Sequence, residues 1–573
     1  MNQAPLDILR QYWRYDTFRP LQHEIIASVL AGSDTVALLP TGAGKSLCFQ
    51  LPALVKPGIC LVISPLIALM KDQVDQLRKK NITAFALTSG MNRKELINMM
   101  KVAADSNCKF LYVSPERLGT AVFMEYLPVL TINLIAVDEA HCVSQWGYDF
   151  RPAYLRIAAL RRELPDTPML ALTASATPDV LEDICNKLEL RDPARFRLPF
   201  TRPNLSYSVF SVISAGDKIA EILQRVAGSS IVYCQSRKAT ATISAQLERH
   251  GLSAAPYHAG LLQEERRKRQ EDWIKDRLRV MVCTTAFGMG IDKPGVRTVI
   301  HAGIPDSLEN YYQEAGRAGR DGNRAYAVLL FEQNSLAALR ALPDIRFPHQ
   351  DTVRRIFQGM MNYLQLPAGS GEGNYYDFDA TRFIDAFGLD AQEVWSSIKV
   401  LEQEGLMSYQ QQVFLPSRVQ WLTDRKALQE FEQLQPDLRA LIHALLRNYP
   451  GIFEDQVPVY EKRLAFALHR DQPWIVAGLQ QLHAWRMIMY TPRKDTPQLY
   501  FFRDRPNAED LYIDPVGYRD RKERYAARIL AMESYLEMKR GCRSRRLANY
   551  FGDETAADCG ICDRCLEARK NSC

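Results

Sequence analysis

Short apolar runs alternate with segments of helical spacing over the first 340 residues of the chain. Uninterrupted apolar runs are typical of parallel strands, because helices cover both faces of such a sheet. The pattern therefore predicts an α/β fold. We expect buried strands at Thr35–Leu39, Cys60–Ile63, Leu111–Val113, Leu134–Val137, Met169–Leu172, Ser230–Tyr233, Val280–Cys283 and Thr298–Ile300.

Two breaks divide this pattern. Leu198–Asn204, which is rich in Pro and Arg, predicts a link between two α/β lobes at 1–200 and 201–340. Gly369–Gly373 predicts a flexible break at the end of a connector, 341–372.

The pattern then changes to a helix followed by a hairpin, twice. Apolar residues at helical spacing mark the helices, and Gly405 ends the first one. Tandem winged helices, 373–435 and 436–518, would give this pattern, and an unrelated α+β domain is the alternative. The turns near 410–412 and 492–497 are candidates for a strand-separating hairpin. The helical stripes are Val394, Ile398, Leu401 and Ile475, Leu479, Leu482, and the second hairpin pairs Met487–Tyr490 with Leu499–Phe502.

Composition excludes some classes of protein. No apolar run in the 573 residues is long enough to cross a membrane, and the N-terminus lacks a signal-peptide pattern, so the cytoplasm is expected. In a bacterium the protein would lie with the nucleoid. A net charge of +6 is compatible with nucleic acid but weak support for it. Twelve cysteines in a cytoplasmic chain favour metal binding over disulfides where they cluster.

A phosphate-binding loop is predicted at Thr41–Ser46, between a strand and a helix. Gly42 and Gly44 let backbone N–H groups converge on phosphate oxygens, as would be needed for ATP. Lys45 would reach the β and γ phosphates, and the Ser46 hydroxyl would bind Mg²⁺.

An acidic box follows the strand Leu134–Val137. Asp138 would hold the magnesium, and Glu139 would act as general base on the attacking water. His141 is close enough in sequence to link this site to the second lobe. Upstream, Gln22 could bond both edges of adenine while Tyr15 or Arg19 stacks on the ring, and an ordinary helix entry is the alternative.

The segment Tyr311–Gly322 carries two arginines, Arg317 and Arg320, which the spacing places on one helical face. A guanidinium that crosses a cleft can neutralise charge that develops on the γ phosphate. Gln313 is expected to contact the nucleotide, and Asp292 to bond its ribose.

A cysteine cluster near the C-terminus comprises Cys542, Cys559, Cys562 and Cys565, within a helical module at 519–573. Four thiolates suit tetrahedral Zn²⁺ in a structural site, and an iron–sulfur cluster is the alternative. The neighbouring arginines could face DNA phosphates or form a solvated helix face. They are Arg540, Arg543, Arg545 and Arg546.

These motifs, in this order, resemble the superfamily 2 helicases of the RecQ family. The resemblance implies two RecA-like lobes, ATP bound between them and 3′-to-5′ translocation on single-stranded DNA, with repair or recombination as its setting. The motifs are Phe18–Gln22, Pro40–Ser46, Asp138–His141, Leu172–Thr177, Ala286–Pro294 and Gln313–Gly322.

An aromatic-rich segment after the acidic box supports the resemblance. Trp146, Phe150 and Arg151 would couple DNA binding to hydrolysis, as the matching loop does in RecQ-like enzymes. The alternative is that Trp146 and Phe150 belong to the core. Ser175 replaces a more usual threonine but keeps the hydroxyl, so coupling is expected to be retained.

The cysteine block departs from the family's usual arrangement, because about 180 residues separate it from the second lobe. Either the intervening part loops out and the zinc module still packs on the lobes, or the accessory half is rearranged. We expect an ATP-dependent helicase acting on single-stranded and duplex DNA, as a monomer and with a single-strand-binding protein as a partner. The alternatives are an RNA helicase, a translocase that does not separate strands, and a DNA-binding regulator with a degenerate ATPase.

Overall fold

The chain forms two compact units in this computed structural model, Met1–Gln350 with Tyr512–Cys573 and Asp351–Leu511. Each unit is described by itself. The described residues are 4–88, 91, 93–144, 146–147, 150–285, 287, 293–410, 417–423, 428, 431, 435–492 and 496–571.

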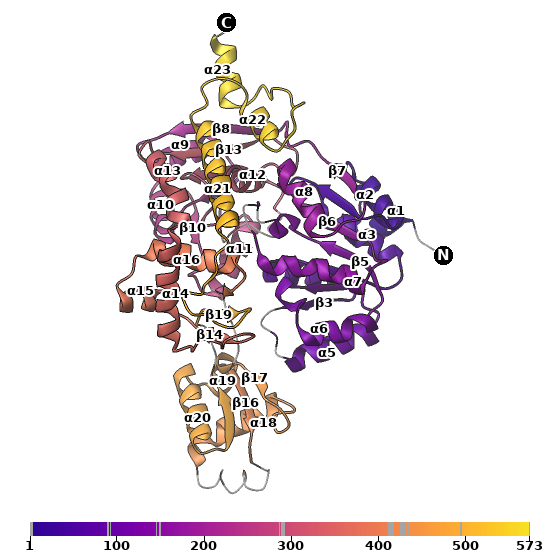
Figure 1. Cartoon of the computed structure of the whole chain (residues 1–573), viewed down its shortest axis with the longest axis vertical. Coiled ribbons are helices and arrows are strands. Elements are labelled where there is room, and N and C mark those ends of the chain that lie inside the picture. The colour runs from indigo at the N-terminus through magenta and orange to yellow at the C-terminus, as the bar shows by residue number, and fades with distance from the viewer. Residues whose placement is uncertain are drawn as a thin grey trace. The chain divides into compact units, whose positions relative to one another are not determined.

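The first lobe is a seven-stranded sheet in the order β3-β4-β2-β5-β6-β1-β7, and every strand pair in it is parallel. Helices cover the sheet (Figure 1). Its strands are β1 Thr35–Leu38, β2 Ile59–Ile63, β3 Ala84–Leu87, β4 Phe110–Val113, β5 Ile132–Val137, β6 Met169–Thr173 and β7 Ala194–Arg197. Its helices are α1 Pro5–Trp13, α2 Gln22–Leu30, α3 Lys45–Val55, α4 Ile67–Lys79, α5 Arg93–Asp105, α6 Ala121–Tyr126, α7 Leu160–Glu163 and α8 Pro178–Lys187, with short 3-10 turns that include η3 Ala140–Val143 and η4 Pro152–Ala159.

The second lobe is a six-stranded parallel sheet in the order β10-β11-β9-β12-β13-β8. The residues between β7 and β8 join the two sheets, where the sequence predicted a link. The strands are β8 Leu205–Ser211, β9 Ser229–Tyr233, β10 Ala254–Tyr257, β11 Val280–Cys283, β12 Val296–Ala302 and β13 Ala325–Phe331. The helices are α9 Ala215–Arg225, α10 Arg237–Arg249, α11 Gln263–Ile274, α12 Leu308–Ala315 and α13 Ser335–Arg346.

The eight predicted strands are confirmed, each within a few residues of its expected bounds. Five further strands were not predicted. Four of them, β3, β7, β8 and β10, are the edges of the two sheets, and β7 and β8 carry a weaker apolar signal because polar residues alternate with apolar ones. The fifth, β13, is an interior strand. Its apolar sequence would have been enough to predict it, so this strand was missed.

The C-terminal module belongs to the same unit as the two lobes. It consists of α21 Pro515–Leu536, α22 Arg543–Tyr550 and α23 Asp563–Asn571, and α21 packs beside α13 (Figure 1). The hydroxyl of Ser206 donates to the carbonyl of Ile561 at 2.6 Å, and the N–H of Val209 donates to Asp563 at 3.1 Å, so the module is bound to β8. The first alternative is therefore confirmed: the module packs on the lobes, and 351–511 folds separately.

The second unit contains two small antiparallel sheets, ordered β14-β19-β15 and β17-β16-β18. Its helices are α14 Gln350–Leu364, α15 Ala380–Phe387, α16 Ala391–Gln403, α18 Arg439–Asn448, α19 Glu461–Leu468 and α20 Gln472–Ala484. Its strands are β14 Tyr375–Asp377, β15 Met407–Gln410, β16 Ser417–Trp421, β17 Val457–Val459, β18 Ile488–Thr491 and β19 Gln498–Phe501.

The two predicted hairpins are wrong. β15 pairs with β19, whereas β16 pairs with β17 and β18. The second unit thus consists of two similar halves that exchange their central strands, β16 and β19. The halves are α14-β14-α15-α16-β15 and α18-β17-α19-α20-β18. Alternation predicts that a strand exists but does not choose its partner. The turns at 411–412 and 493–495, which were candidates for strand separation, lie outside the described residues.

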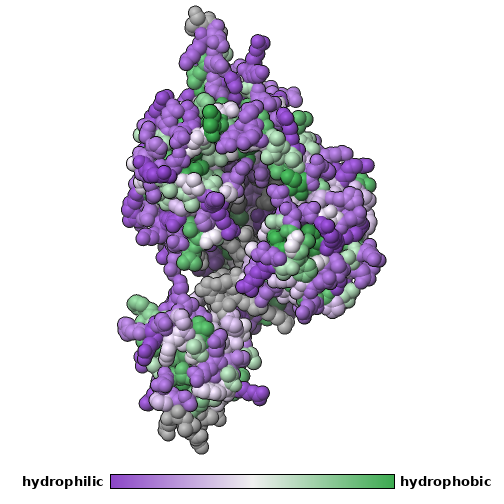
Figure 2. Space-filling model, turned by 90° about the vertical axis from the view of Figure 1, so that its left-hand side faces the viewer, coloured by the Kyte–Doolittle hydropathy of each residue, from purple (hydrophilic) through white to green (hydrophobic). Residues whose placement is uncertain are grey.

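The face seen in Figure 2 is mostly hydrophilic, with hydrophobic residues in small separate groups. Among the described helices, none has the length and apolar character needed to cross a membrane.

Candidate nucleotide and zinc sites

The phosphate loop connects β1 to α3. Gly42 and Gly44 have φ of +88° and +82°, which is the left-handed region that glycine enters at little cost. The side chains of Thr41, Lys45 and Ser46 are half-buried, and Lys45 Nζ lies 3.4 Å from the carbonyl of Leu39. The loop therefore presents backbone donors, a lysine and the N-terminus of α3 toward one place, which fits a phosphate chain.

Asp138 follows β5, and β6 alone separates β5 from β1. The carboxyl ends of these parallel strands meet at one edge of the sheet, so Asp138 lies near the phosphate loop. Burial and the neighbouring carboxylate of Glu139 raise the pKa of Asp138 to about 7, while Lys45 and a backbone N–H oppose the rise. A buried carboxylate beside the phosphate loop fits the oxygen donors that Mg²⁺ takes next to bound phosphates.

Glu139 has a strained backbone. Its φ of +47° lies in the left-handed region, which costs a non-glycine residue on the order of 1 kcal/mol. One carboxylate oxygen lies 3.4 Å from His141 Nδ1, which in turn hydrogen-bonds Thr173 at 2.9 Å. This contact ties the acidic box to β6 of its own lobe, and the predicted link from His141 to the second lobe stays a prediction.

Gln22 is buried, with 1% of its surface exposed. Its amide nitrogen donates to the carbonyls of Ala43 at 3.3 Å and Gly44 at 3.1 Å, and Arg19 donates to the carbonyl of Gly42. Arg19 and Gln22 thus support the phosphate loop through hydrogen bonds to its backbone carbonyls. Contacts of Gln22, Arg19 and the exposed Tyr15 with adenine remain predictions.

The two candidate arginines do not share a helical face, which corrects the sequence prediction. α12 ends at Ala315, and both arginines lie in the turns that follow, where Gly319 has a φ of +62°. Arg317 is buried, with 6% exposed, beside the hydroxyl of Tyr233 in its own lobe. Because the chain turns after Ala315, the arginines point to different surroundings.

Arg320 lies at the phosphate loop. A Cβ added to Gly42 would be 3.2 Å from Arg320 Cγ and 3.4 Å from its Nε. In the same way, a Cβ added to Gly316 would be 2.6 Å from the hydroxyl oxygen of Thr41. The second lobe therefore meets the phosphate loop of the first, and Arg320 is the arginine at that junction.

The link between the lobes holds the arginine segment, a role that the sequence did not predict. Arg202 donates to the carbonyls of Gly316 at 2.9 Å and Gly319 at 2.5 Å, and Asn204 donates to Gly319 at 2.7 Å. The Arg- and Asn-containing sequence of the link was the available signal. Of the other nucleotide candidates, Gln313 is buried on α12 and Asp292 lies outside the described residues.

The aromatic-rich segment is joined to the acidic box. Trp146 is 39% exposed and Phe150 is half-buried, so Trp146 is not a core residue. The hydroxyl of Tyr154, on η4, donates to the carbonyl of Asp138 at 3.0 Å, and Arg151 donates to the carbonyl of Pro65 at 3.2 Å. The first of these hydrogen bonds connects η4, which follows the segment, to the strand end that carries Asp138 and Glu139.

The four clustered cysteines converge as a metal site requires. All four sulfur atoms lie within 4.8 Å of one another, close to the separation of about 3.8 Å that tetrahedral Zn–S bonds of about 2.3 Å impose. Backbone N–H groups point at these sulfurs, among them that of Cys559 toward Cys542 at 3.2 Å and that of Cys565 toward Cys562 at 3.4 Å. The convergence of four thiols and these N–H donors fits Zn²⁺.

Four family models match the chain in the order of these elements. They are DEAD/DEAH box helicase at 19–184, helicase conserved C-terminal domain at 215–322, RecQ helicase winged-helix domain of Bacteroidota at 419–492, and RecQ zinc-binding at 494–566. The chain belongs to the RecQ family of helicases. Zinc in the cysteine cluster and ATP with Mg²⁺ at the phosphate loop are the cofactors of this architecture.

Curated relatives carry the same family name. The ATP-dependent DNA helicase RecQ of Bacillus subtilis (strain 168) is 44% identical over 338 residues, 58% of this chain and 57% of the relative. The ATP-dependent DNA helicase RecQ of Pasteurella multocida (strain Pm70) is 41% identical over 421 residues, 70% of this chain and 66% of the relative. The chain thus spans less than two thirds of the length of these relatives.

A solved structure shares the fold over part of the chain. The DUF1998 helicase MrfA bound to DNA and AMPPNP superposes with a TM-score of 0.50 at 20% identity, over 58% of this chain and 50% of that one.

The arginines around the first cysteine of this RecQ module have different roles. Arg543 is fully buried, pairs with Asp563 at 2.7 Å and donates to the carbonyl of Tyr535, so it cannot face DNA. It fixes α22 and α23 to the end of α21. The expectation that all four arginines face solvent or DNA is therefore wrong for this one.

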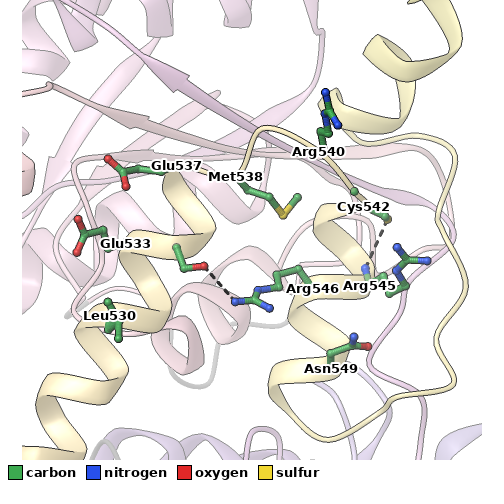
Figure 3. Close-up of a pocket in the computed structure, with 11 residues that line it drawn as sticks. Leu530, Glu533, Glu537, Met538, Arg540, Cys542, Arg545, Arg546 and Asn549 are labelled. Carbon is green, nitrogen blue, oxygen red and sulfur yellow. Dashed lines mark hydrogen bonds between the residues drawn. The ribbon is translucent and has the colours of Figure 1, made fainter. Parts of the chain in front are cut away.

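The other three arginines line a pocket of about 690 Å³ between the end of α21 and α22 (Figure 3). Arg546 donates to the hydroxyl of Ser534 at 3.0 Å, and Arg545 pairs with Asp558 at 3.1 Å. Arg540 is exposed at its rim. A DNA contact by these residues stays a prediction.

Proposed function

We propose that this protein is an ATP-dependent DNA helicase that couples hydrolysis to translocation on single-stranded DNA. The observation that carries the proposal is the junction of the two lobes at the phosphate loop, where Arg320 lies against Gly42. A hydrolase whose site lies within one lobe needs no arginine from a second lobe. A motor whose two lobes open and close does need one, because that arginine makes hydrolysis depend on closure.

The roles of the side chains follow from their places. Lys45 and the loop N–H groups bind the phosphates, and Asp138 with Ser46 would hold Mg²⁺, which neutralises phosphate charge when bound. Glu139 takes the proton of the attacking water. Arg320 stabilises the charge that develops on the γ phosphate, so hydrolysis proceeds when the lobes are closed.

Coupling to DNA is assigned to the segment that carries Trp146. Its exposed ring offers a face on which a base can stack, a contact of about 1–3 kcal/mol. Because the Tyr154 hydroxyl bonds the backbone at Asp138, a shift of the segment reaches the residues that hydrolyse ATP.

The direction of movement, 3′ to 5′, rests on the family resemblance. So do a role in repair or recombination, a location with DNA in the cytoplasm, and a single-strand-binding protein as partner. We propose that the working form is a monomer.

The test is ATP turnover with and without a single-stranded DNA oligomer, followed by unwinding of duplexes with 3′ or 5′ tails. Lys45→Ala and Glu139→Gln should abolish DNA-stimulated turnover, while DNA binding by fluorescence anisotropy survives. Normal unwinding by either variant would refute the scheme. Stimulation by RNA alone would favour an RNA helicase, and turnover without strand separation a translocase.

A further inference from the structure

Trp146 contacts a helix of the zinc module. The guanidinium carbon of Arg524, on α21, lies 4.3 Å from the centroid of the Trp146 ring. Arg528, one helical turn further along, donates from Nη1 to the Trp146 carbonyl at 3.0 Å. Two arginines near the C-terminus thus hold the residue that we assign to sensing DNA.

The helix that carries these arginines is fixed to the second lobe. Lys522 pairs with Asp344 at 2.7 Å, and Arg340 donates to Glu533 at 2.7 Å. These ion pairs lie on either side of the two arginines along α21. The contact with Trp146 therefore joins the second lobe to the first.

The other side of the contact leads to the catalytic strand. The N–H of Trp146 donates to the hydroxyl of Ser144 at 3.1 Å, directly after η3. The strained Glu139 caps the start of the same turn. Trp146 is consequently connected through a few residues to the general base.

We propose that Arg524 and Arg528 are positioning residues that hold the aromatic segment in its DNA-free place. Arg524 covers a face of Trp146, and Arg528 holds its backbone. A base that stacks on Trp146 displaces Arg524 and frees the segment to shift. This inference rests on the proposed function, since it concerns the regulation of that site.

The relative strengths of the two contacts make this exchange feasible. At an exposed site a cation–π contact shifts an equilibrium by about two- to fivefold. Stacking of one base shifts it by about fivefold to 150-fold. DNA can therefore outcompete Arg524, whereas in its absence the arginine holds the ring. The displaced guanidinium can then pair with a DNA phosphate.

The first experiment measures ATP turnover without DNA in Arg524→Gln and Arg528→Gln. Arg524→Gln should raise DNA-free turnover by about two- to fivefold, the strength of the lost cation–π contact. Arg528→Gln should raise it as well, because it removes the hydrogen bond to the Trp146 carbonyl. Arg519→Gln is the matched control, because Arg519 is on the same helix and faces Glu523 at 3.9 Å. In a Trp146→Ala background Arg524→Gln should have no further effect. Unchanged DNA-free turnover in Arg524→Gln, with stimulation by DNA intact in the parent protein, overturns the proposal.

A second measurement needs neither ATP nor DNA. Acrylamide quenching of Trp146, obtained as the difference between the parent protein and Trp146→Phe, should increase in Arg524→Gln and stay unchanged in Arg519→Gln. Equal quenching in all variants, at equal thermal stability, also overturns the proposal. The two proposals can fail separately. If DNA does not stimulate turnover by the parent protein, the proposed function is refuted. If Trp146 nevertheless becomes more accessible in Arg524→Gln, the contact between Arg524 and Trp146 still stands.

Discussion

Arg320 of the second lobe lies against the backbone of Gly42 in the first, so that a Cβ on Gly42 would be 3.2 Å from Arg320 Cγ. Arg317, three residues earlier, is buried beside Tyr233 in its own lobe. The two arginines therefore have different surroundings, although they have the same side chain and lie in one motif.

Replacing Arg320 should act on turnover and leave the fold intact. Arg320→Ala is expected to lower DNA-stimulated kcat by about a thousandfold or more, as for other arginines that stabilise charge on a γ phosphate. The change in KM for ATP should be smaller. Steady-state kinetics and thermal melting measure the two effects.

Arg317→Ala is the comparison. It should lower the melting temperature, because it removes a buried group from the core of the second lobe. Loss of kcat by Arg317→Ala alone, with Arg320→Ala active, would reverse the assignment.

Gly42→Ala tests the closeness of the two lobes. The substitution forces alanine to adopt a φ of +88° and places a methyl group against Arg320, so ATP turnover should fall steeply. Gly32→Ala is the matched control, since Gly32 has a φ of +87° and open space around it. If both variants lose activity equally, backbone strain rather than contact with Arg320 is responsible.

Arg543 should be essential for stability of the zinc module. Arg543→Met leaves the carboxylate of Asp563 without its buried partner, and loss of one partner of such a pair costs about 3–5 kcal/mol. Urea unfolding monitors the loss. Arg540→Met, at an exposed position beside the same cysteine, should change stability by about 0.5 kcal/mol at most. Equal effects would contradict the difference in roles.

The exchange of central strands in the second unit can be tested by cross-linking. Ser408 on β15 lies opposite Tyr500 on β19. Ser408→Cys with Tyr500→Cys should form a disulfide under mild oxidation, detected by mass spectrometry after proteolysis. Ser408→Cys with Gln420→Cys, on β15 and β16, should not. The reverse result would restore the local hairpins that the sequence favours.

Edge strands and strand partners mark the limit of sequence-based prediction here. The interior strands β1, β2, β4, β5 and β6 have continuous apolar sequences because both of their faces are buried. The edge strands β7 and β8 alternate apolar with polar residues and carry a weaker signal. In the second unit, local order suggested hairpins, but packing between distant segments selected the partners.

The sequence by itself determined the chemistry of this protein. Phosphate loop, acidic box and cysteine cluster are local patterns whose residue types and spacing already specify phosphate, magnesium and zinc. Only the tertiary structure decided that Arg320 reaches the phosphate loop, that Arg543 is buried, and that α21 contacts Trp146. These outcomes depend on where the chain turns after Ala315 and on contacts between residues hundreds of positions apart. No local pattern encodes such contacts, because they follow from how whole elements pack.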